Sequence, residues 1–273
     1  MASMVRWVEQ GLTLLADPGM MRPTMNLRGK TVLITGAAKR LGREIALTLA
    51  GRGADIVVHY SRSFKEAETL GKEIRCLGVQ AHLVQADFNP MRAGISKQVR
   101  DFAKKVFRKT SSVEVLINNA AIFYPTPFET ISEKDWDAFM TINLKVPFFL
   151  AQVFGLRMQN QKEGKIINLA DWTGERPPLR FIPYAVSKAG LVSVTKGLAK
   201  ALAPHVQVLS IAPGPILPAE GATMKEQKLA AEKSLLKRYG NTKDIANAVR
   251  FLIEDSDFMT GSTLYVDGGA SLV

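Results

Sequence analysis

Residues 30–51 read KTVLITGAAKRLGREIALTLAG, and this stretch decides the fold. Its first six residues form a short apolar run rich in β-branched side chains, which is typical of a buried parallel strand. Residues 43–50 have the character of a helix. The turn between them carries Gly36 and Gly42, and such a turn points backbone N–H groups at an anion, with the positive end of the helix dipole behind them. The stretch therefore predicts a strand, a pyrophosphate-binding turn and a helix.

Composition places the chain among soluble globular proteins. Its 273 residues are enough for one large α/β domain, and 47% hydrophobic with 22% charged residues is an ordinary balance. The single cysteine, Cys76, excludes an intramolecular disulfide and indicates a cytoplasmic location. The net charge of +11 favours an anionic ligand. We interpret the densest basic cluster, residues 104–109, as a solvated helix face and expect no nucleic-acid partner.

The first 26 residues differ from the rest of the chain. They are rich in Met, and Trp7, Leu12 and Leu15 favour a short amphipathic helix that ends near Pro18. The apolar run is too short and too polar to span a membrane. We therefore expect a leader over residues 1–26, a domain over residues 27–273, and no membrane partner.

From Leu27 onward, predicted strands alternate with predicted helices. The strands are expected at 30–35, 55–59, 81–85, 113–117, 165–169, 206–211 and 263–266, and the helices at 43–50, 64–77, 91–109, 132–158 and 183–203. Repeated βα units predict a single α/β domain with a doubly wound, seven-stranded parallel sheet and helices on both faces. Ligands are then expected at the carboxyl ends of the strands.

Tyr184 and Lys188 are the candidate catalytic pair. Positions four residues apart share one face of a helix, so Lys188 can lie beside Tyr184. A nearby ammonium is expected to lower the pKa of the phenol and make it a usable acid at neutral pH. The alternative is an exposed Tyr and Lys on an ordinary helix, but their position after the fifth strand of a nucleotide-binding fold favours catalysis.

Together, these features resemble the short-chain dehydrogenase/reductase family over residues 27–273. The matching positions are Thr35, Gly36, Gly42, Asp87, Asn118, Asn119, Ala120, Asn143, Tyr184, Lys188, Pro213, Gly214, Asp267, Gly268 and Gly269. The resemblance implies a Rossmann fold and hydride transfer between a nicotinamide and a carbonyl or imine. It implies that Tyr184 donates a proton, that Lys188 binds the nicotinamide ribose and that Asn143 holds a relay water. A helix-bending polar residue is the competing interpretation of Asn143.

Several departures from the family pattern resemble the pteridine and dihydromonapterin reductases. Asp171 stands 13 residues before Tyr184, where the family usually has serine, and Arg40 replaces a glycine of the turn. Phe123 begins a Phe-Tyr-Pro-Thr-Pro motif after the fourth strand. The resemblance implies that a flat pterin stacks between Phe123 and the nicotinamide. It also implies that Arg40 reaches the cofactor phosphate and the pterin, and that Asp171 helps Tyr184 to deliver protons. Ala121 departs from the serine of the eukaryotic pteridine reductases.

The cofactor is expected to be NADP(H). The segment after the second strand, residues 59–63, has no carboxylate to bind a ribose 2′-hydroxyl, but it has Arg62 to meet a 2′-phosphate and Ser63 to add a hydrogen bond. The resemblance implies a larger cofactor-binding set: Gly36, Arg40, Leu41, His59, Tyr60, Arg62, Ser63, Asp87, Phe88, Asn119, Ala120, Ala121, Tyr184, Lys188, Pro213 and Gly214. We expect no metal site.

The family resemblance also implies a homotetramer that pairs the helices at 132–158 and 183–203. Their apolar residues Phe139, Phe148, Phe149 and Leu198 could serve either the core or an interface.

Three hypotheses about function remain at this point. The first is an NADPH-dependent reductase of a pterin or a related heterocycle. The second is a reductase of another carbonyl, such as a 3-oxoacyl thioester or a sugar, in which Asp171 is incidental. The third is a non-catalytic dinucleotide-binding or scaffold protein, and the presence of Tyr184, Lys188 and Asn143 argues against it.

Overall fold

A computed structural model describes residues 24–89, 91, 94–218, 223–224, 228 and 231–273. These residues form a seven-stranded sheet in the order β3-β2-β1-β4-β5-β6-β7, and every neighbouring pair is parallel. The strands are β1 (Thr31–Ile34), β2 (Asp55–Tyr60), β3 (Ala81–Gln85), β4 (Val115–Asn118), β5 (Gly164–Leu169), β6 (Val206–Pro213) and β7 (Thr263–Val266). The predicted doubly wound parallel sheet is confirmed.

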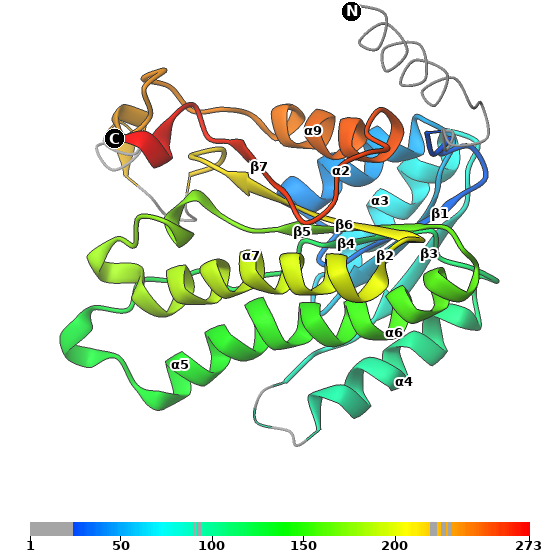
Figure 1. Ribbon diagram of the computed structural model, residues 1–273, viewed down its shortest axis with the longest axis horizontal. Coiled ribbons are helices and arrows are strands. Elements are labelled where there is room, and N and C mark those ends of the chain that lie inside the picture. Colours follow the sequence, from blue (N-terminus) through cyan, green and yellow to red (C-terminus); the bar gives the residue numbers. More distant parts are fainter. Residues whose placement is uncertain (1–23, 90, 92–93, 219–222, 225–227, 229–230) are drawn as a thin grey trace, which may run out of the picture.

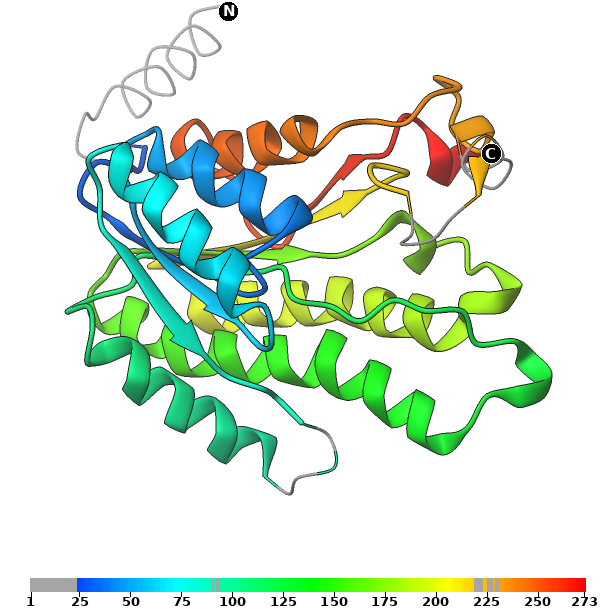
Figure 2. The same cartoon turned by 180° about the vertical axis from the view of Figure 1, so that it is seen from behind.

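Helices cover both faces of the sheet (Figures 1 and 2). One layer contains α2 (Arg40–Ala50), α3 (Phe64–Cys76) and α9 (Thr242–Glu254), and the other contains α4 (Ile95–Phe107), α5 (Glu133–Met140), α6 (Val146–Asn160) and α7 (Ile182–Leu202). Ile45 and Leu49 of α2 belong to one hydrophobic core, while Phe102 of α4 and Phe154 of α6 belong to the other. The basic cluster lies on an exposed face at the end of α4, as expected.

Several elements differ from the sequence prediction in their bounds: α2, for example, begins at Arg40 rather than residue 43, and β4 spans Val115–Asn118 rather than 113–117. Helix α4 begins at Ile95 rather than residue 91, directly after Gly94 in a left-handed conformation with φ 78°. Strand β6 continues to Pro213, because that residue pairs with Val266 of β7. The helix expected over 132–158 is divided into α5 and α6 by a π-helical turn at Thr141–Lys145. This turn contains Asn143.

The leader expected over residues 1–26 lies almost wholly outside the described residues. Met25 and Leu27, which the structure does describe, are buried in the core beside α2. Within the described part of the chain, the stretch Glu133–Asn160 is long and apolar enough to cross a membrane by length and composition, but 50% of its most apolar window is buried inside the domain. Its apolar character therefore belongs in large part to the core.

The carboxyl ends of β1 and β4 are joined by hydrogen bonds. The Thr35 hydroxyl accepts from the backbone N–H groups of Asn119 (2.9 Å) and Ala120 (3.0 Å). The Asn119 side-chain amide in turn donates to the carbonyls of Thr35 (2.8 Å) and Gly36 (3.1 Å). Because the strand order reverses between β1 and β4, these bonds place the glycine turn at the topological switch point, where α/β sheets bind ligands.

Candidate active site

Tyr184, Asp171 and Lys188 meet beyond the carboxyl end of β5. Tyr184 lies in the first turn of α7, and its hydroxyl donates a hydrogen bond to Asp171 Oδ2 at 2.8 Å. Lys188 is one turn further along, and its Nζ lies 5.6 Å from the centre of the Tyr184 ring. The same Nζ donates to the carbonyl of Leu169 at 2.6 Å. The structure thus brings together three of the four residues that the sequence proposed as a catalytic group, and Asn143 is the fourth.

Asp171 is held by the short 3-10 helix that follows β5. Its Oδ1 accepts from both the backbone N–H (2.9 Å) and the hydroxyl (2.7 Å) of Thr173. Each carboxylate oxygen therefore has a donor, one from Thr173 and one from Tyr184. The sequence reasoning missed Thr173, although an Asp at a helix N-cap commonly bonds to the N–H two or three residues later.

Protonation of the group differs from the sequence expectation. Burial, and then the charge and hydrogen bond of Asp171, raise the pKa of Tyr184 well above its ordinary value. The expectation that this pKa is lowered was wrong, because desolvation and the neighbouring carboxylate set its direction. Burial also lowers the pKa of Lys188 to about 8. Burial raises the pKa of Asp171, opposed by its bonds from Thr173 and by the Lys188 charge.

Asn143 forms hydrogen bonds to the loop after β4 and to α7. Its Oδ1 accepts from Ile122 N–H (2.9 Å), and its Nδ2 donates to the Ile122 carbonyl (3.1 Å) and to Ser187 Oγ (3.2 Å). Ser187 Oγ donates to the carbonyl of Tyr184 at 2.6 Å. The buried amide of Asn143 therefore links the loop that carries Phe123 to the helical turn that carries Tyr184.

Phe123 lies beside the proposed proton donor. Its ring contacts the Tyr184 ring edge-on, with centroids 4.8 Å apart, and remains half exposed. Its ring also stacks on Phe181, with centroids 4.7 Å apart and planes inclined by 2°. Phe181 was missed in the sequence, although its position three residues before Tyr184 places it one helical turn away. The two rings form a stack, in which Phe181 covers one face of the Phe123 ring.

The glycine turn has the shape that a dinucleotide phosphate requires. Gly36 is left-handed (φ 63°), and a Cβ added there would lie 3.1 Å from Ala120 Cα. A Cβ on Gly42 would lie 2.5 Å from the Gly36 carbonyl oxygen. The N-cap residue Lys39 makes no side-chain cap bond within the described structure, so the first N–H groups of α2 suit an external anion. Arg40 is left-handed as well (φ 53°), and its Nη2 donates to the Pro218 carbonyl at 2.9 Å.

The end of β2 offers a second place for an anion. Arg62 is exposed, and Ser63 is the N-cap of α3 without a side-chain cap bond among the described residues. Ser61 Oγ donates to Asp87 Oδ1 at 2.9 Å, which joins the segments after β2 and β3. A cationic side chain beside an uncapped helix start fits a 2′-phosphate.

The other proposed cofactor residues lie along the same edge of the sheet. Leu41 is in the first turn of α2, Tyr60 ends β2, Ala121 is exposed after β4, and Pro213 ends β6 and precedes Gly214. Phe88 and His59 differ from these, because both are buried and their rings pack against each other with centroids 5.4 Å apart.

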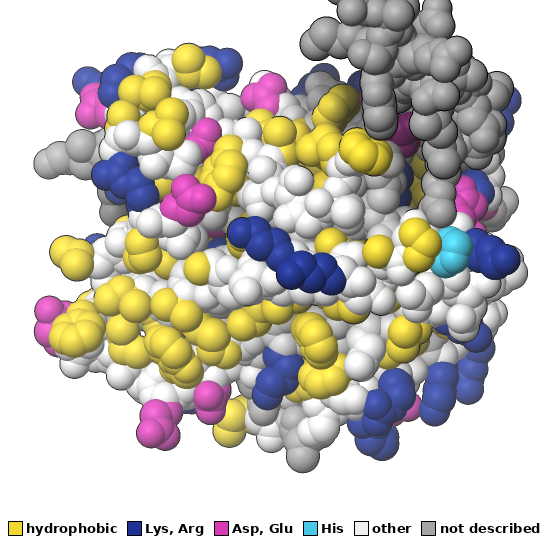
Figure 3. Space-filling view, in the orientation of Figure 1, with side chains coloured by type: hydrophobic (Ala, Val, Ile, Leu, Met, Phe, Trp, Pro, Cys, Tyr) yellow, Lys and Arg dark blue, Asp and Glu magenta, His cyan; other side chains and the backbone are white. Residues whose placement is uncertain are grey.

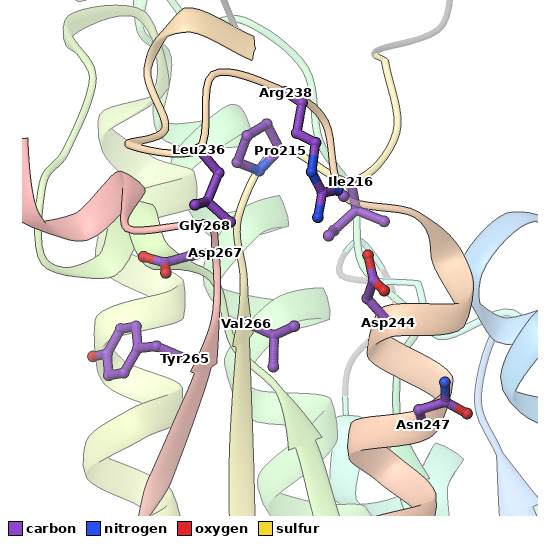
Figure 4. A pocket seen from close by; sticks show the side chains of 11 residues that line it. Pro215, Ile216, Leu236, Arg238, Asp244, Asn247, Tyr265, Val266, Asp267 and Gly268 are labelled. Atoms are coloured by element: carbon purple, nitrogen blue, oxygen red, sulfur yellow. The ribbon is translucent and has the colours of Figure 1, made fainter.

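A cavity of about 420 Å³ lies beyond β6 and β7 (Figure 4). Pro215 and Ile216 form one wall, Asp244 and Asn247 of α9 another, and Arg238 points in from the preceding loop. Among the residues that the structure describes, its lining does not include Tyr184, Asp171 or Lys188. This cavity therefore adjoins the end of β6 and is separate from the candidate catalytic residues.

Comparisons with known proteins agree with this geometry. The family model described as short chain dehydrogenase matches residues 30–229. A 3-oxoacyl-[acyl-carrier-protein] reductase of Staphylococcus epidermidis is 36% identical over 88% of this chain and 98% of its own length. A second 3-oxoacyl-[acyl-carrier-protein] reductase, of Synechocystis sp., is 34% identical over 89% and 97% of the two chains. The crystal structure of a blue fluorescent protein from a metagenomic library, in complex with NADPH, superposes with a TM-score of 0.82 at 32% identity over 90% of this chain and 99% of that one.

Proposed function

The chain belongs to the short-chain dehydrogenase family, and from this membership we propose that it is an NADPH-dependent reductase with Tyr184 as the proton donor. The observation that carries the proposal is the buried Tyr184 hydroxyl, held by Asp171 at the same sheet edge as the glycine turn. The NADPH in the similar solved structure supports the cofactor, and the fit of Gly36 and Gly42 supports it independently.

The reaction divides into binding and proton transfer. When bound, NADPH supplies the hydride. The first turn of α2 binds the pyrophosphate, and Arg62 binds the 2′-phosphate. Tyr184 donates its hydroxyl proton to the substrate atom that becomes negative. Asp171 holds that hydroxyl in place, and burial raises the pKa of the carboxyl, which favours its protonated form. Lys188 provides a buried positive charge close to the forming phenolate.

Different observations support two substrate classes. The site geometry supports a pterin-type heterocycle, because Asp171 is bonded directly to Tyr184 and Phe123 offers a flat ring beside it. The curated relatives support a 3-oxoacyl thioester, and they support it better than they support a pterin. We keep both as proposals, with the heterocycle resting on Asp171 and the thioester resting on the relatives.

A substrate panel distinguishes the two proposals. NADPH absorbance is followed with biopterin, dihydrobiopterin, dihydromonapterin, dihydrofolate and an acetoacetyl thioester. The largest kcat/KM with a dihydropterin selects the heterocycle, and the largest kcat/KM with the thioester selects the second proposal. An absence of NADPH oxidation with every compound, in a protein that binds NADPH, would return the chain to the class of non-catalytic dinucleotide-binding proteins.

The protein is expected to prefer NADPH to NADH, and Arg62→Ala is expected to remove most of that preference. Arg62 is an exposed cation beside the uncapped start of α3, and a hydrogen bond to a charged group contributes about 1.5–3 kcal/mol. The KM for NADPH should therefore rise by roughly 10–150-fold, while the KM for NADH changes little. Steady-state kinetics with both cofactors check this. An unchanged NADPH preference in Arg62→Ala would contradict it.

We also propose that the protein is a homotetramer that pairs α6 and α7. Hydrophobic side chains gather over α5 and α6 (Figure 3), and the exposed ones on α6 and α7 include Phe148, Leu156 and Val186. Phe139 and Leu198 are buried within the chain's own core, so they are not available to an interface.

Light scattering at micromolar concentration is expected to give the mass of a tetramer. Leu156→Glu should lower that mass, because a charge in an apolar interface is costly. Leu77→Glu is a matched control, since Leu77 is equally exposed but follows α3 in the opposite helix layer. A monomeric mass for the wild-type protein would refute the proposal.

A further inference from the structure

His59 occupies an unusual position beneath the glycine turn. It lies near the end of β2, only 3% of the residue is exposed, and its ring packs on Phe88 and Phe102 with centroid distances of 5.4 and 5.1 Å. A ring buried in this way is shielded from a ligand on the outer side of the turn. The contact role that the family resemblance suggested for His59 therefore does not fit its surroundings.

Instead, His59 binds the first two N–H groups of the turn. Its Nδ1 accepts from Gly36 N–H at 3.0 Å, and its main-chain carbonyl accepts from Ala37 N–H at 3.0 Å. Its Nε2 lies 3.2 Å from the carbonyl oxygen of Ala86, just beyond β3. An acceptor at Nδ1 and a carbonyl opposite Nε2 require the neutral tautomer with the proton on Nε2.

We propose that His59 is a positioning residue for the dinucleotide, which holds the glycine turn at its Gly36 end in one geometry through the neutral Nε2–H tautomer. Gly36 and Ala37 donate their N–H groups to His59, so these two groups point toward β2 rather than toward a ligand. The ring also spans from the turn to the end of β3. It thus fixes the distance between the glycine turn and the segment around Asp87.

The surroundings keep the ring neutral. Burial lowers the pKa of His59 to about 4, opposed by the Ala86 bond and by the charge of Asp87. Among the described residues, Asp87 is the charged group that affects the pKa of the ring. The neighbouring side chains of Phe88 and Phe102 are uncharged aromatic rings. On the turn itself, Lys39 is paired with Glu66 and Arg40 bonds to Pro218. Between pH 5 and 8 the ring therefore stays neutral and keeps its acceptor toward Gly36.

This inference rests on the proposed cofactor, and the test separates the two. Binding of NADPH to the full wild-type chain, measured by fluorescence and calorimetry without substrate, tests the cofactor. Two variants then test His59. His59→Asn keeps an acceptor where Nδ1 stands and loses the Nε2 donor, whereas His59→Gln keeps a donor near Nε2 and loses the Nδ1 acceptor. Both variants lose the aromatic packing, so a merely structural role would weaken NADPH binding about equally in the two.

The expected result is a split between the variants. NADPH binding should weaken by about tenfold or more in His59→Gln, and by about threefold or less in His59→Asn, in line with the cost of an unsatisfied buried donor. His82→Gln, on the neighbouring strand β3, should leave binding unchanged. Nitrogen NMR of the wild-type ring should show the Nε2–H tautomer from pH 5 to 8. Equal weakening in both variants, the reverse order, or a ring that titrates near pH 6.5 would overturn the inference.

Discussion

Tyr184→Phe is expected to lower kcat by about 10²–10⁴-fold, the usual contribution of a positioned general acid. The phenol is the group that Asp171 holds at 2.8 Å, and Phe retains its ring but has no proton to give. The dissociation constant for NADPH should stay within about threefold, because the groups proposed to bind its phosphates follow β1 and β2, whereas Tyr184 lies on α7. Single-turnover NADPH oxidation and fluorescence titration measure the two quantities separately.

Tyr124→Phe is the matched control for this variant. Tyr124 also donates its hydroxyl to an aspartate, Asp135, at 3.1 Å, but that bond lies at the start of α5 and outside the reacting group. Its removal should change kcat by less than about threefold, since neither partner touches the Tyr184 hydroxyl. Near-normal turnover in Tyr184→Phe would remove the proposed mechanism. An equal loss in both variants would show that packing, rather than proton donation, was disturbed.

Asp171→Ser is expected to lower kcat/KM for a dihydropterin by about tenfold or more relative to a simple ketone, because a hydrogen bond to a charged group contributes about 1.5–3 kcal/mol. The variant restores the side chain that the family usually has at this position. A ketone needs one proton donor at its oxygen, which Tyr184 still provides. A ring nitrogen of a pterin also requires a proton, and Asp171 is the bonded neighbour of Tyr184 that can supply it.

The pH dependence gives the second measurement on Asp171. Its pKa is raised by burial, so the protonated fraction grows as the pH falls, at a higher pH than for an ordinary aspartate. The wild-type kcat/KM for a dihydropterin should therefore increase from pH 8 toward pH 5, and the increase should be smaller in Asp171→Ser. If the variant reduces a dihydropterin at the wild-type rate throughout this range, Asp171 is a turn residue and the thioester proposal takes its place.

The raised pKa of Asp171 also predicts the direction in which the free energy of unfolding changes with pH. The native state keeps this proton at pH values at which the unfolded chain has lost it. The contribution to the free energy of unfolding is thus fully present below the ordinary pKa of 3.8 and is lost as the pH rises through the raised value. Thermal melting of the wild type and of Asp171→Ser at several pH values would show this difference between them.

The strand–turn–helix unit and the sheet could be predicted because their signals are local. A buried parallel strand is a continuous apolar run, and β3 and β7 begin and end at the predicted residues. Two of the errors occur where contacts between distant residues decide the structure. The extension of β6 depends on its pairing with β7, and the π-helical turn lies where Asn143 bonds to Ile122, 21 residues earlier in the chain.

In the candidate site, too, local spacing could be predicted and the effects of distant contacts could not. The spacing of Tyr184 and Lys188 on one helix predicts that they are neighbours, and the structure confirms it. Sequence spacing could not predict that the pKa of Tyr184 is raised, because burial and Asp171 determine its direction. Nor could it predict the stacking of Phe181 on Phe123, because α5, α6 and β5 lie between the two residues in the sequence.

The pairing of β1 with β4 also orders events during synthesis. Val32 pairs with Val115, and the Thr35 hydroxyl binds Asn119, which is 84 residues later. A nascent chain that has produced only β1, β2 and β3 therefore lacks the partner that fixes one side of the glycine turn. Closing so long a loop is slow compared with forming the local helices. We therefore expect the glycine turn to reach its final geometry only after β4 has left the ribosome, and a chain interrupted before Val115 to show no affinity for a dinucleotide.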